Sequence, residues 1–374
     1  MKFSNIHGLA DTKQQLIQSV QRNHVAHAQL FSGVDGSALL PMALAFATYL
    51  NCENPGANDA CGECPSCSKS LKFIHPDIHF VYPVSPTDKI TGKDVVSKSY
   101  LPIWRDFLST NPYGNSLDWS HAFGGENKQL NISKQESREI IDALSLKAFE
   151  GKYKIMILWM PELMHPAAAN GILKILEEPS PNTVFLLVSG QKESLLKTIK
   201  SRTQLVRIPP FSNEEIKEIL TSEYQISAEK SDQLAHLADG SLRTAIQIND
   251  ESDINLHSMF IDWMRQCFQN NFIELSGLSE KFAALSKSGQ KSLFLYGLEV
   301  LREALVANQG EQSLFRMTGE ALSFVKNFSK SLNTSIIEEM SSKLSDAHYH
   351  LERNVNAKIV FMNLSILFSN SFKR

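Results

Sequence analysis

Four cysteines in a short stretch of the chain have the spacing of a metal site. They are Cys52, Cys61, Cys64 and Cys67, with prolines and glycines between them. Four thiolates fill a tetrahedral shell and leave no position for water, so the pattern predicts a structural Zn²⁺ site. Because the shell is then complete, the nearby His75 and His79 are left out of it. The alternatives are reduced thiols without metal and a redox pair, but these cysteines do not begin a helix after a strand.

A second group of residues has the frame of a phosphate-binding loop. Such a loop reads G-x-x-x-x-G-K-[ST] between a strand and a helix: its backbone N–H groups hold phosphates, its lysine neutralises them and its hydroxyl holds Mg²⁺. In this chain the stretch from Gly33 to Leu40 reads GVDGSALL. Gly33 and Gly36 keep the turn, but Leu39 takes the lysine position and Leu40 the Ser/Thr position. We therefore expect no ATP to bind here.

The acidic strand that would accompany such a loop has lost its carboxylates as well. An active site needs Asp-Glu at the end of this strand, for Mg²⁺ and for the attacking water. Here the strand ends in Trp159 and Met160. Glu162 lies two residues further on, and we interpret it as a solvated charge at a helix entry rather than a displaced base. Since both halves of the site have become apolar together, we expect the pocket to be closed and packed.

Length and composition indicate a multidomain globular protein. The 374 residues are 43% hydrophobic and 21% charged, with a formal net charge of -3, and suggest two or three domains. A near-neutral balance argues against a surface that is basic overall. The sequence contains no apolar run of about 20 residues and no signal-peptide pattern at its start, so we expect no membrane segment and a cytoplasmic location.

The first two hundred residues or so have the pattern of a doubly wound α/β domain. We expect buried strands at 28–33, 154–158 and 183–189, a strand of alternating pattern at 75–83, and helices at 37–50, 133–149 and 166–178. Ser133 and Glu136 have the spacing of a capping box at the start of one helix. Continuous apolar strands are typical of a parallel sheet that is covered on both faces.

Two further parts of the chain differ from this pattern. Residues 84–130 lack sustained periodicity and are interpreted as a long insertion. Its aromatic residues are Trp104, Phe107, Tyr113, Trp119 and Phe123, and we expect them to pack on their own domain rather than to form a partner patch. After Pro209 and Pro210 the pattern is helical only, which predicts a small helical unit and then an independent helical domain.

Several blocks of this sequence resemble the bacterial clamp-loader subunits of DNA polymerase III. The blocks are residues 3–33, 167–179 (AAANGILKILEEP), 199–203 (IKSRT) and 240–245 (GSLRTA), and the resemblance covers about residues 1–249. The gamma/tau type of subunit has an intact phosphate loop and acidic strand, whereas the delta-prime type is similar overall but has a broken one. This chain resembles the delta-prime type.

The resemblance implies an AAA+ architecture and a role in a complex. It implies an α/β RecA-like domain at 1–208 with a zinc module at 52–67, a helical lid at 209–250 and an all-α collar at 251–374. Members of the family form an open ring that loads the sliding clamp onto primed DNA. The expected partners are therefore gamma/tau and delta subunits, with the clamp and DNA reached through the complex at the nucleoid. The expected role is that of a rigid stator without ATPase activity of its own.

The resemblance also assigns roles to two arginines. In the family, an arginine in a Ser-Arg-Cys motif reaches the ATP of the adjacent subunit, and the matching residue here is Arg202, followed by Thr203 instead of cysteine. An arginine finger can act in trans because it needs only reach. The alternative is an ordinary surface arginine. Arg243 matches a position that senses nucleotide in active members, and here we expect it to serve packing or an ion pair.

Two other functions stay open on the sequence alone. One is an active gamma/tau-like ATPase that uses unusual ligands, such as Lys152 or Lys154. The other is a zinc-dependent nucleic-acid-binding module without a role in clamp loading. Leu39 and Trp159 argue against the first, and assembly with other replication subunits would decide against the second.

Overall fold

The computed structural model describes residues 1–125, 128–145, 147–250, 256–285, 287–310, 314–317, 319–352 and 355–373. The chain forms two compact units. One comprises Met1–Ile219 with Gly240–Arg243, and the other comprises Leu220–Asp239 with Thr244–Arg374. Among the described residues, none of the helices combines the length and apolar character needed to cross a membrane.

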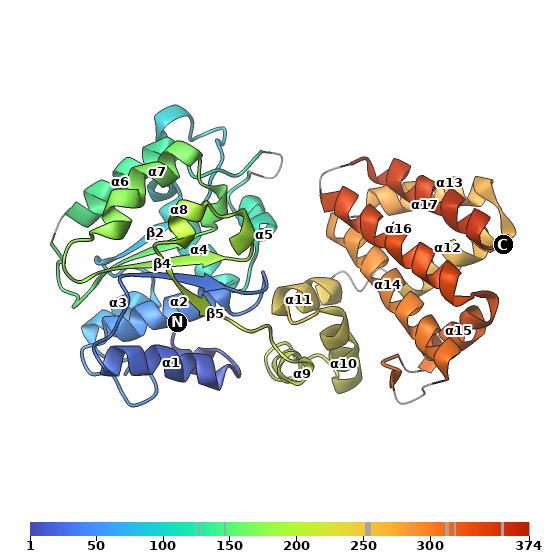
Figure 1. The fold of residues 1–374 in the computed structure, drawn as a ribbon, viewed down its shortest axis with the longest axis horizontal. Helices are drawn as coiled ribbons and strands as arrows, with labels where there is room; N and C mark the ends of the chain where they lie inside the picture. Colours follow the sequence, from blue (N-terminus) through green and yellow to red (C-terminus); the bar gives the residue numbers. More distant parts are fainter. Residues whose placement is uncertain are drawn as a thin grey trace. The chain divides into compact units, whose positions relative to one another are not determined.

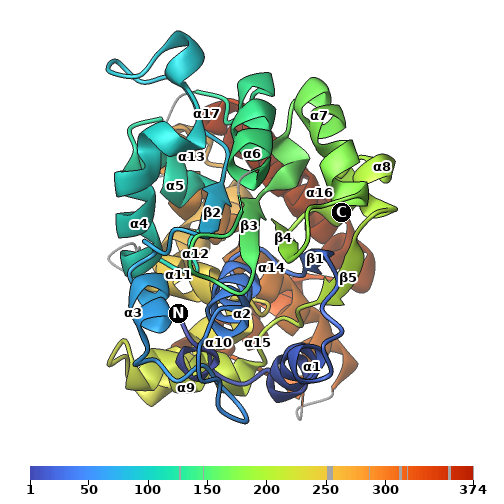
Figure 2. The ribbon, with the colours of Figure 1, turned by 90° about the vertical axis from the view of Figure 1, so that its left-hand side faces the viewer.

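A five-stranded parallel sheet lies at the centre of the first unit (Figures 1 and 2). Its strands are β1 (Ala28–Ser32), β2 (Ile78–Val81), β3 (Lys154–Trp159), β4 (Thr183–Ser189) and β5 (Gln204–Arg207), in the spatial order β2-β3-β4-β1-β5. The side chains of β1, β3 and β4 are all buried, as their continuous apolar sequences predict. The predicted α/β fold is confirmed. The sequence pattern missed β5, because this short edge strand is mostly exposed and has only two apolar residues, Leu205 and Val206.

Helices cover both faces of the sheet. They are α1 (Ala10–Gln21), α2 (Leu39–Leu50), α3 (Pro65–Leu71), α6 (Lys134–Ser145), α7 (Pro166–Glu177) and α8 (Lys197–Lys200). Helix α2 contacts β1, β3 and β4 and is flanked by α1 and α3. Helices α6 and α7 pack together on the opposite face, where Ile140, Leu144 and Ile172 join the sheet in one hydrophobic core (Figure 2).

The start of α6 differs from its prediction. Glu136 does not close a capping box with Ser133; its Oε2 instead accepts the backbone N–H of Ser97 at 2.9 Å, and the Ser133 hydroxyl is buried without a hydrogen-bond partner. The tertiary contact competes successfully with the local one because Glu136 is only 2% exposed and so faces the insertion rather than solvent. The helix ends at Ser145, and residue 146, within its predicted span, lies outside the described residues.

The insertion at 84–130 is a packed part of the first unit. Apart from residues 126 and 127, which are not described, it contains short 3₁₀ turns at Gly92–Asp94 and Ser97–Tyr100 and the helices α4 (Leu101–Thr110) and α5 (Ser116–Ala122). All five of its tryptophan, phenylalanine and tyrosine residues that were singled out above are at most 8% exposed. Trp104 stacks on Tyr82 with ring centroids 4.0 Å apart. The prediction that these aromatic residues pack on their own domain is confirmed.

Beyond β5 the described chain is helical, as predicted. The helices are α9 (Asn213–Ser222), α10 (Ala228–Leu237), α11 (Leu242–Asp250), α12 (Leu256–Gln269), α13 (Phe272–Ala284), α14 (Lys287–Gln309), α15 (Gly319–Phe328), α16 (Thr334–Glu352) and α17 (Ala357–Ser371). Helices α12 to α17 share a hydrophobic core around Trp263, which stacks on Phe361 and donates its indole N–H to Ser365 Oγ at 2.8 Å. These C-terminal helices are therefore held together by one hydrophobic core.

Candidate functional site

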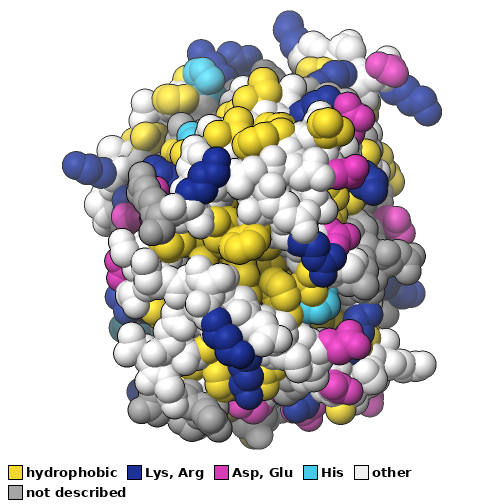
Figure 3. All heavy atoms as spheres, turned by 90° about the vertical axis from the view of Figure 1, so that its right-hand side faces the viewer, with side chains coloured by type: hydrophobic (Ala, Val, Ile, Leu, Met, Phe, Trp, Pro, Cys, Tyr) yellow, Lys and Arg dark blue, Asp and Glu magenta, His cyan; other side chains and the backbone are white. Residues whose placement is uncertain are grey.

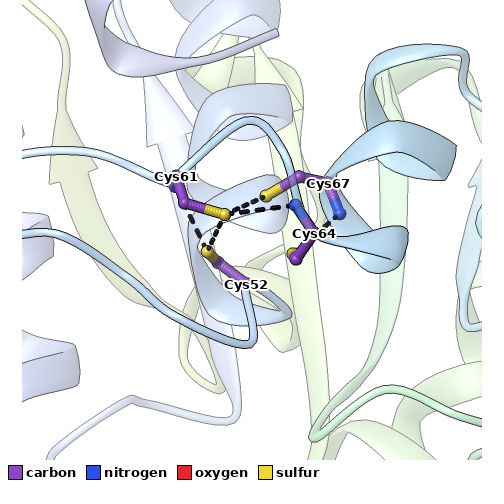
Figure 4. Close-up of side chains that lie close together, drawn as sticks. All are labelled: Cys52, Cys61, Cys64 and Cys67. Atoms are coloured by element: carbon purple, nitrogen blue, oxygen red, sulfur yellow. Dashed lines mark hydrogen bonds between the residues drawn. The ribbon is translucent and has the colours of Figure 1, made fainter.

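The four predicted cysteine ligands come together beside the start of α3 (Figure 4). Cys52 follows α2, Cys64 is the N-cap of α3, and Cys67 lies in its first turn. All four Sγ atoms lie within 4.8 Å of one another; Cys61 Sγ is 3.5 Å from that of Cys52 and 3.8 Å from that of Cys67. A tetrahedral Zn²⁺ with Zn–S bonds of about 2.3 Å places its sulfurs about 3.8 Å apart. The cluster therefore has the size that this ion requires.

Backbone N–H groups also point at the sulfurs. The N–H groups of Cys61, Cys64 and Cys67 donate to the Sγ atoms of Cys52, Cys61 and Cys64, at 3.3, 3.4 and 3.3 Å. Such bonds lower the pKa of the Cys61 thiol to about 6, whereas burial raises the pKa of Cys52 and of Cys67. A divalent cation would favour the thiolate form of all four. The donor set therefore fits a metal ion, and neither His75 nor His79 belongs to the group.

The glycine turn between β1 and α2 uses its own N–H groups internally. Gly36 N donates to Asp35 Oδ1 at 3.2 Å, and Ser37 N donates to the carbonyl of Val34 at the same distance. In an active loop such groups point at phosphate. Gly36 has φ +75°, and a Cβ there would lie 2.8 Å from the Cβ of Arg243, so the turn depends on glycine. The frame is present, but two of its donors are already occupied.

The space beside this turn is almost filled. Leu39, Leu40, Trp159 and Met160 are all at most 6% exposed, and the insertion segment 112–114 completes the lining. The free space that remains is about 10 Å³, whereas pockets for small ligands measure about 300–1,000 Å³. The expectation of a closed and packed pocket is confirmed.

The structure also places two charged residues that were considered from the sequence. Glu162 is not a solvated charge: it is half-buried, its Oε2 has no hydrogen-bond partner, and burial raises the pKa of its carboxyl group. Lys154 begins β3, at the opposite end of the strand from Trp159, and its buried ammonium donates to the carbonyl of Leu144. Lys154 therefore does not lie at the glycine turn as a replacement for the missing lysine.

Arg202 lies just after α8, near the surface of the first unit. Its Nε donates to Glu177 Oε1 at 2.6 Å, and its Nη1 donates to the carbonyl of Thr198 at 2.9 Å. The side chains of Arg202 and Glu177 are 30% and 47% exposed. Exposed pairs of this kind contribute at most about 1 kcal/mol, so a stronger anion can displace the glutamate. Arg243, the second arginine, forms the expected ion pair, with Asp118 of the insertion.

Sequence reasoning missed Asp118 and the segment 112–114 as parts of this site. No local pattern marks them, because the contacts join residues that are far apart in the chain, 125 positions in the case of Asp118 and Arg243. The one available signal was the sequence Asn115-Ser-Leu-Asp118, which has the spacing of a helix cap and forms a capping box at α5.

Comparison with known proteins gives a consistent family. The model of the family described as "DNA polymerase III, delta subunit" matches residues 8–212. The delta-prime subunit of DNA polymerase III from Bacillus subtilis is 26% identical over 63% of this chain and 58% of its own length. Its counterpart from Pseudomonas aeruginosa is 26% identical over 69% and 66%, and that from Escherichia coli is 26% identical over 53% and 46%. Each alignment thus spans about half to two thirds of the relative.

A solved structure gives a weaker likeness. A protein from Thermotoga maritima related to the gamma subunit of DNA polymerase III is 15% identical, with 98% of this chain and all of that chain covered and a TM-score of 0.37. A score of this size adds nothing to the argument. The family match, in contrast, covers more than half of the chain and includes the glycine turn, the cysteine cluster and Arg202. The chain therefore belongs to the DNA polymerase III delta-subunit family.

Proposed function

We propose that the chain is a non-catalytic subunit of the DNA polymerase III clamp loader. In this role it works with gamma/tau and delta subunits, at the nucleoid in the cytoplasm, to place the sliding clamp on primed DNA. The delta-prime relatives support the assignment to this polymerase. The observation that carries the non-catalytic part is the nucleotide site, where the loop keeps its glycine turn but the space beside it is only about 10 Å³.

The chain is proposed neither to bind nor to hydrolyse ATP. Binding would require a lysine and a hydroxyl where Leu39 and Leu40 are buried at 4% and 3% exposure. Hydrolysis would require carboxylates where Trp159 and Met160 lie. Each position is packed against apolar neighbours, so a nucleotide could enter only if the core opened. A subunit of this kind gives the moving subunits a rigid surface to work against.

Arg202 is proposed to serve the ATP site of the adjacent subunit. An arginine finger stabilises charge that develops on the transferred phosphoryl group, and it requires an accessible guanidinium on a well-ordered support. Arg202 has both properties: it is 30% exposed, and Thr198 and Glu177 fix its orientation. Since the pair with Glu177 is weak, the phosphate of a neighbouring ATP would replace the carboxylate as the partner.

The cysteine cluster is proposed to hold one structural Zn²⁺. The ion would link the end of α2 to the first turn of α3 through Cys52 and Cys67. With four thiolates there is no open coordination position, so the zinc would stabilise the fold of this module and take no part in chemistry.

The proposed architecture has three parts, a RecA-like domain at 1–208, a lid at 209–250 and a collar at 251–374. The collar is proposed to contact other subunits. Figure 3 shows hydrophobic side chains gathered on one face of the C-terminal helices. The collar also carries an apolar groove of about 230 Å³, whose lining includes Ile261, Met264, Phe268, Phe324, Phe328 and Phe372. Apolar surface of this kind is typical of stable subunit contacts.

The experiment that tests this function is reconstitution of the clamp loader with variants of this chain. With Arg202→Ala, DNA-stimulated ATP hydrolysis by the complex should fall several-fold, because one ATP site loses its finger. Arg207→Ala, which removes an exposed arginine from the neighbouring strand, is the matched control and should leave the rate unchanged. Equal rates for both variants and the unmodified complex would remove the proposed role, and failure of the chain to join the complex would remove the whole assignment.

A further inference from the structure

An ion pair joins the insertion to the start of α11, next to the glycine turn. Arg243, in the first turn of α11, donates from Nε to Asp118 Oδ2 at 2.6 Å and from Nη2 to Asp118 Oδ1 at 2.5 Å. The two side chains are only 15% and 13% exposed. Two parallel bonds between a guanidinium and a carboxylate are the geometry in which arginine also binds phosphate.

The pair lies beside the glycine turn. Arg243 donates its backbone N–H to the carbonyl of Gly36 at 3.1 Å, and a Cβ on Gly36 would come within 2.8 Å of the Cβ of Arg243. Gly36 is in the turn that leads into α2, and a helix N-terminus of this kind attracts negative charge. The anion that Arg243 binds next to this turn is therefore a side chain of the protein itself, that of Asp118.

Contacts other than the one with Arg243 also fix the position of Asp118. Its Oδ2 accepts the backbone N–H of Asn115 at 2.9 Å, and Asn115 Oδ1 accepts the N–H groups of Leu117 and Asp118 at 2.9 and 3.1 Å. This reciprocal capping box fixes the start of α5. Just before it, the ring of Tyr113 packs edge-on against Phe211 with centroids 6.0 Å apart. The carboxylate is therefore presented by a rigid support.

We propose that the insertion is a built-in substitute for a nucleotide. Asp118 gives Arg243 the anionic partner that a phosphate would otherwise provide, and the insertion segment 112–114 fills the space beside the turn. The segment Gly240–Arg243 is thereby anchored to the sheet domain without any ligand. This anchoring is a property of the chain alone and does not depend on the proposed role in a complex.

Hydrogen exchange on the full-length chain tests this anchor. Asp118→Ala should speed exchange of the amides at residues 242–246 by about tenfold or more, because the first turn of α11 loses its bond to the insertion. Amides of β1 and β3 should exchange as before. Asp142→Asn, which neutralises an exposed acid of the same unit, is the matched control and should change neither region.

A second experiment with inorganic phosphate distinguishes two roles of the ion pair: Asp118 as a substitute for a bound anion, and Asp118 as a partner that only stabilises the fold. Added to Asp118→Ala, phosphate at millimolar concentration should slow exchange at 242–246 again, because it would take the place of the Asp118 carboxylate on Arg243. Phosphate should have no such effect on the unmodified chain or on Arg243→Gln. If Asp118→Ala does not fold, Arg243→Gln also serves as the variant that tests the anchor. Unchanged exchange at 242–246, uniform acceleration across β1 and β3, or no slowing by phosphate would each overturn the proposal.

Discussion

The indole ring of Trp159 lies 5.1 Å, centroid to centroid, from that of Trp104 in the insertion. Trp159 ends β3, at the position where an active enzyme would carry a carboxylate, and Trp104 is fully buried. Trp104 also stacks on Tyr82 and meets Trp119 edge-on at 5.0 Å. The end of β3 is therefore part of an aromatic core that the insertion largely builds.

The first prediction concerns that core. Trp104→Ala should lower the free energy of unfolding by about 3–5 kcal/mol, because it removes a fully buried ring and leaves a cavity. Phe149→Ala is the matched control, since the Phe149 side chain is 82% exposed, and it should change stability by less than about 0.5 kcal/mol. Urea denaturation followed by tryptophan fluorescence and circular dichroism measures both. Similar unfolding midpoints for the two variants would contradict the packing described here.

The second prediction concerns repair of the phosphate loop. The double substitution Leu39→Lys with Leu40→Thr restores the lysine and the hydroxyl of the motif, while Ala38 keeps the second glycine position; we expect it not to restore ATP binding. The insertion still fills the site, and the N–H groups of Gly36 and Ser37 still donate hydrogen bonds within the turn. The variant should also unfold at a lower temperature, because the lysine would be buried without a partner. Titration with a fluorescent ATP analogue measures the outcome, and saturable binding by a folded variant would show that the loop residues alone had been lacking.

The α/β fold could be predicted because the patterns that mark its strands and its cysteine cluster are local in the sequence. Continuous apolar runs marked β1, β3 and β4, and four cysteines close together in the chain marked the cluster. Leu39, Leu40 and Trp159 likewise indicated, from the sequence alone, that the nucleotide site is packed with apolar side chains. Edge strand β5 was missed because its exposed residues lack the apolar run by which the other strands were found.

The third prediction is a pH dependence caused by Glu136. Burial raises the pKa of this carboxyl group from 4.5 to about 7, although hydrogen bonds from Ser97 oppose the shift. Between these values the folded chain binds more protons than the unfolded chain, so the free energy of unfolding falls as pH rises from about 4.5 to 7. The effect amounts to at most about 3 kcal/mol. Glu136→Gln should remove this part of the slope.

The measurement for Glu136 is urea denaturation at a series of pH values from 4.5 to 8. The glutamine side chain keeps an oxygen that can accept the Ser97 N–H, so the variant changes the charge more than the packing. Asp142→Asn, at an exposed position of the same helix, is the matched control and should leave the slope as it is. Parallel curves for Glu136→Gln and the unmodified chain would show that the carboxyl group titrates normally.

The fourth prediction concerns the metal. The purified chain should contain about one zinc per molecule, and Cys61→Ser should lose most of it together with several degrees of thermal stability. Cys267→Ser is the matched control: this cysteine lies buried in the core formed by α12 to α17, outside the cluster, and its removal should leave the zinc content unchanged. Elemental analysis by mass spectrometry gives the content. Zinc-free protein that is as stable as the untreated chain would argue against a structural metal.

The contact between Asp118 and Arg243 shows where sequence reasoning stopped. An ion pair was expected for Arg243, but nothing in the chain indicated its partner, because Asp118 lies in a segment without periodicity. Nor did the sequence indicate that the N–H of Ser97 would donate to Glu136, which therefore does not close the local capping box. Both contacts are set by how the insertion packs on the sheet domain, which only the three-dimensional structure gives.

We propose that this chain keeps the frame of a nucleotide site but neither binds nor hydrolyses ATP. Isothermal titration of MgATP into the purified full-length chain tests this most directly. We predict no saturable heat at millimolar ATP and no phosphate release above the buffer rate, because the space at the glycine turn is only about 10 Å³. Stoichiometric binding in the micromolar range, followed by turnover, would contradict the account.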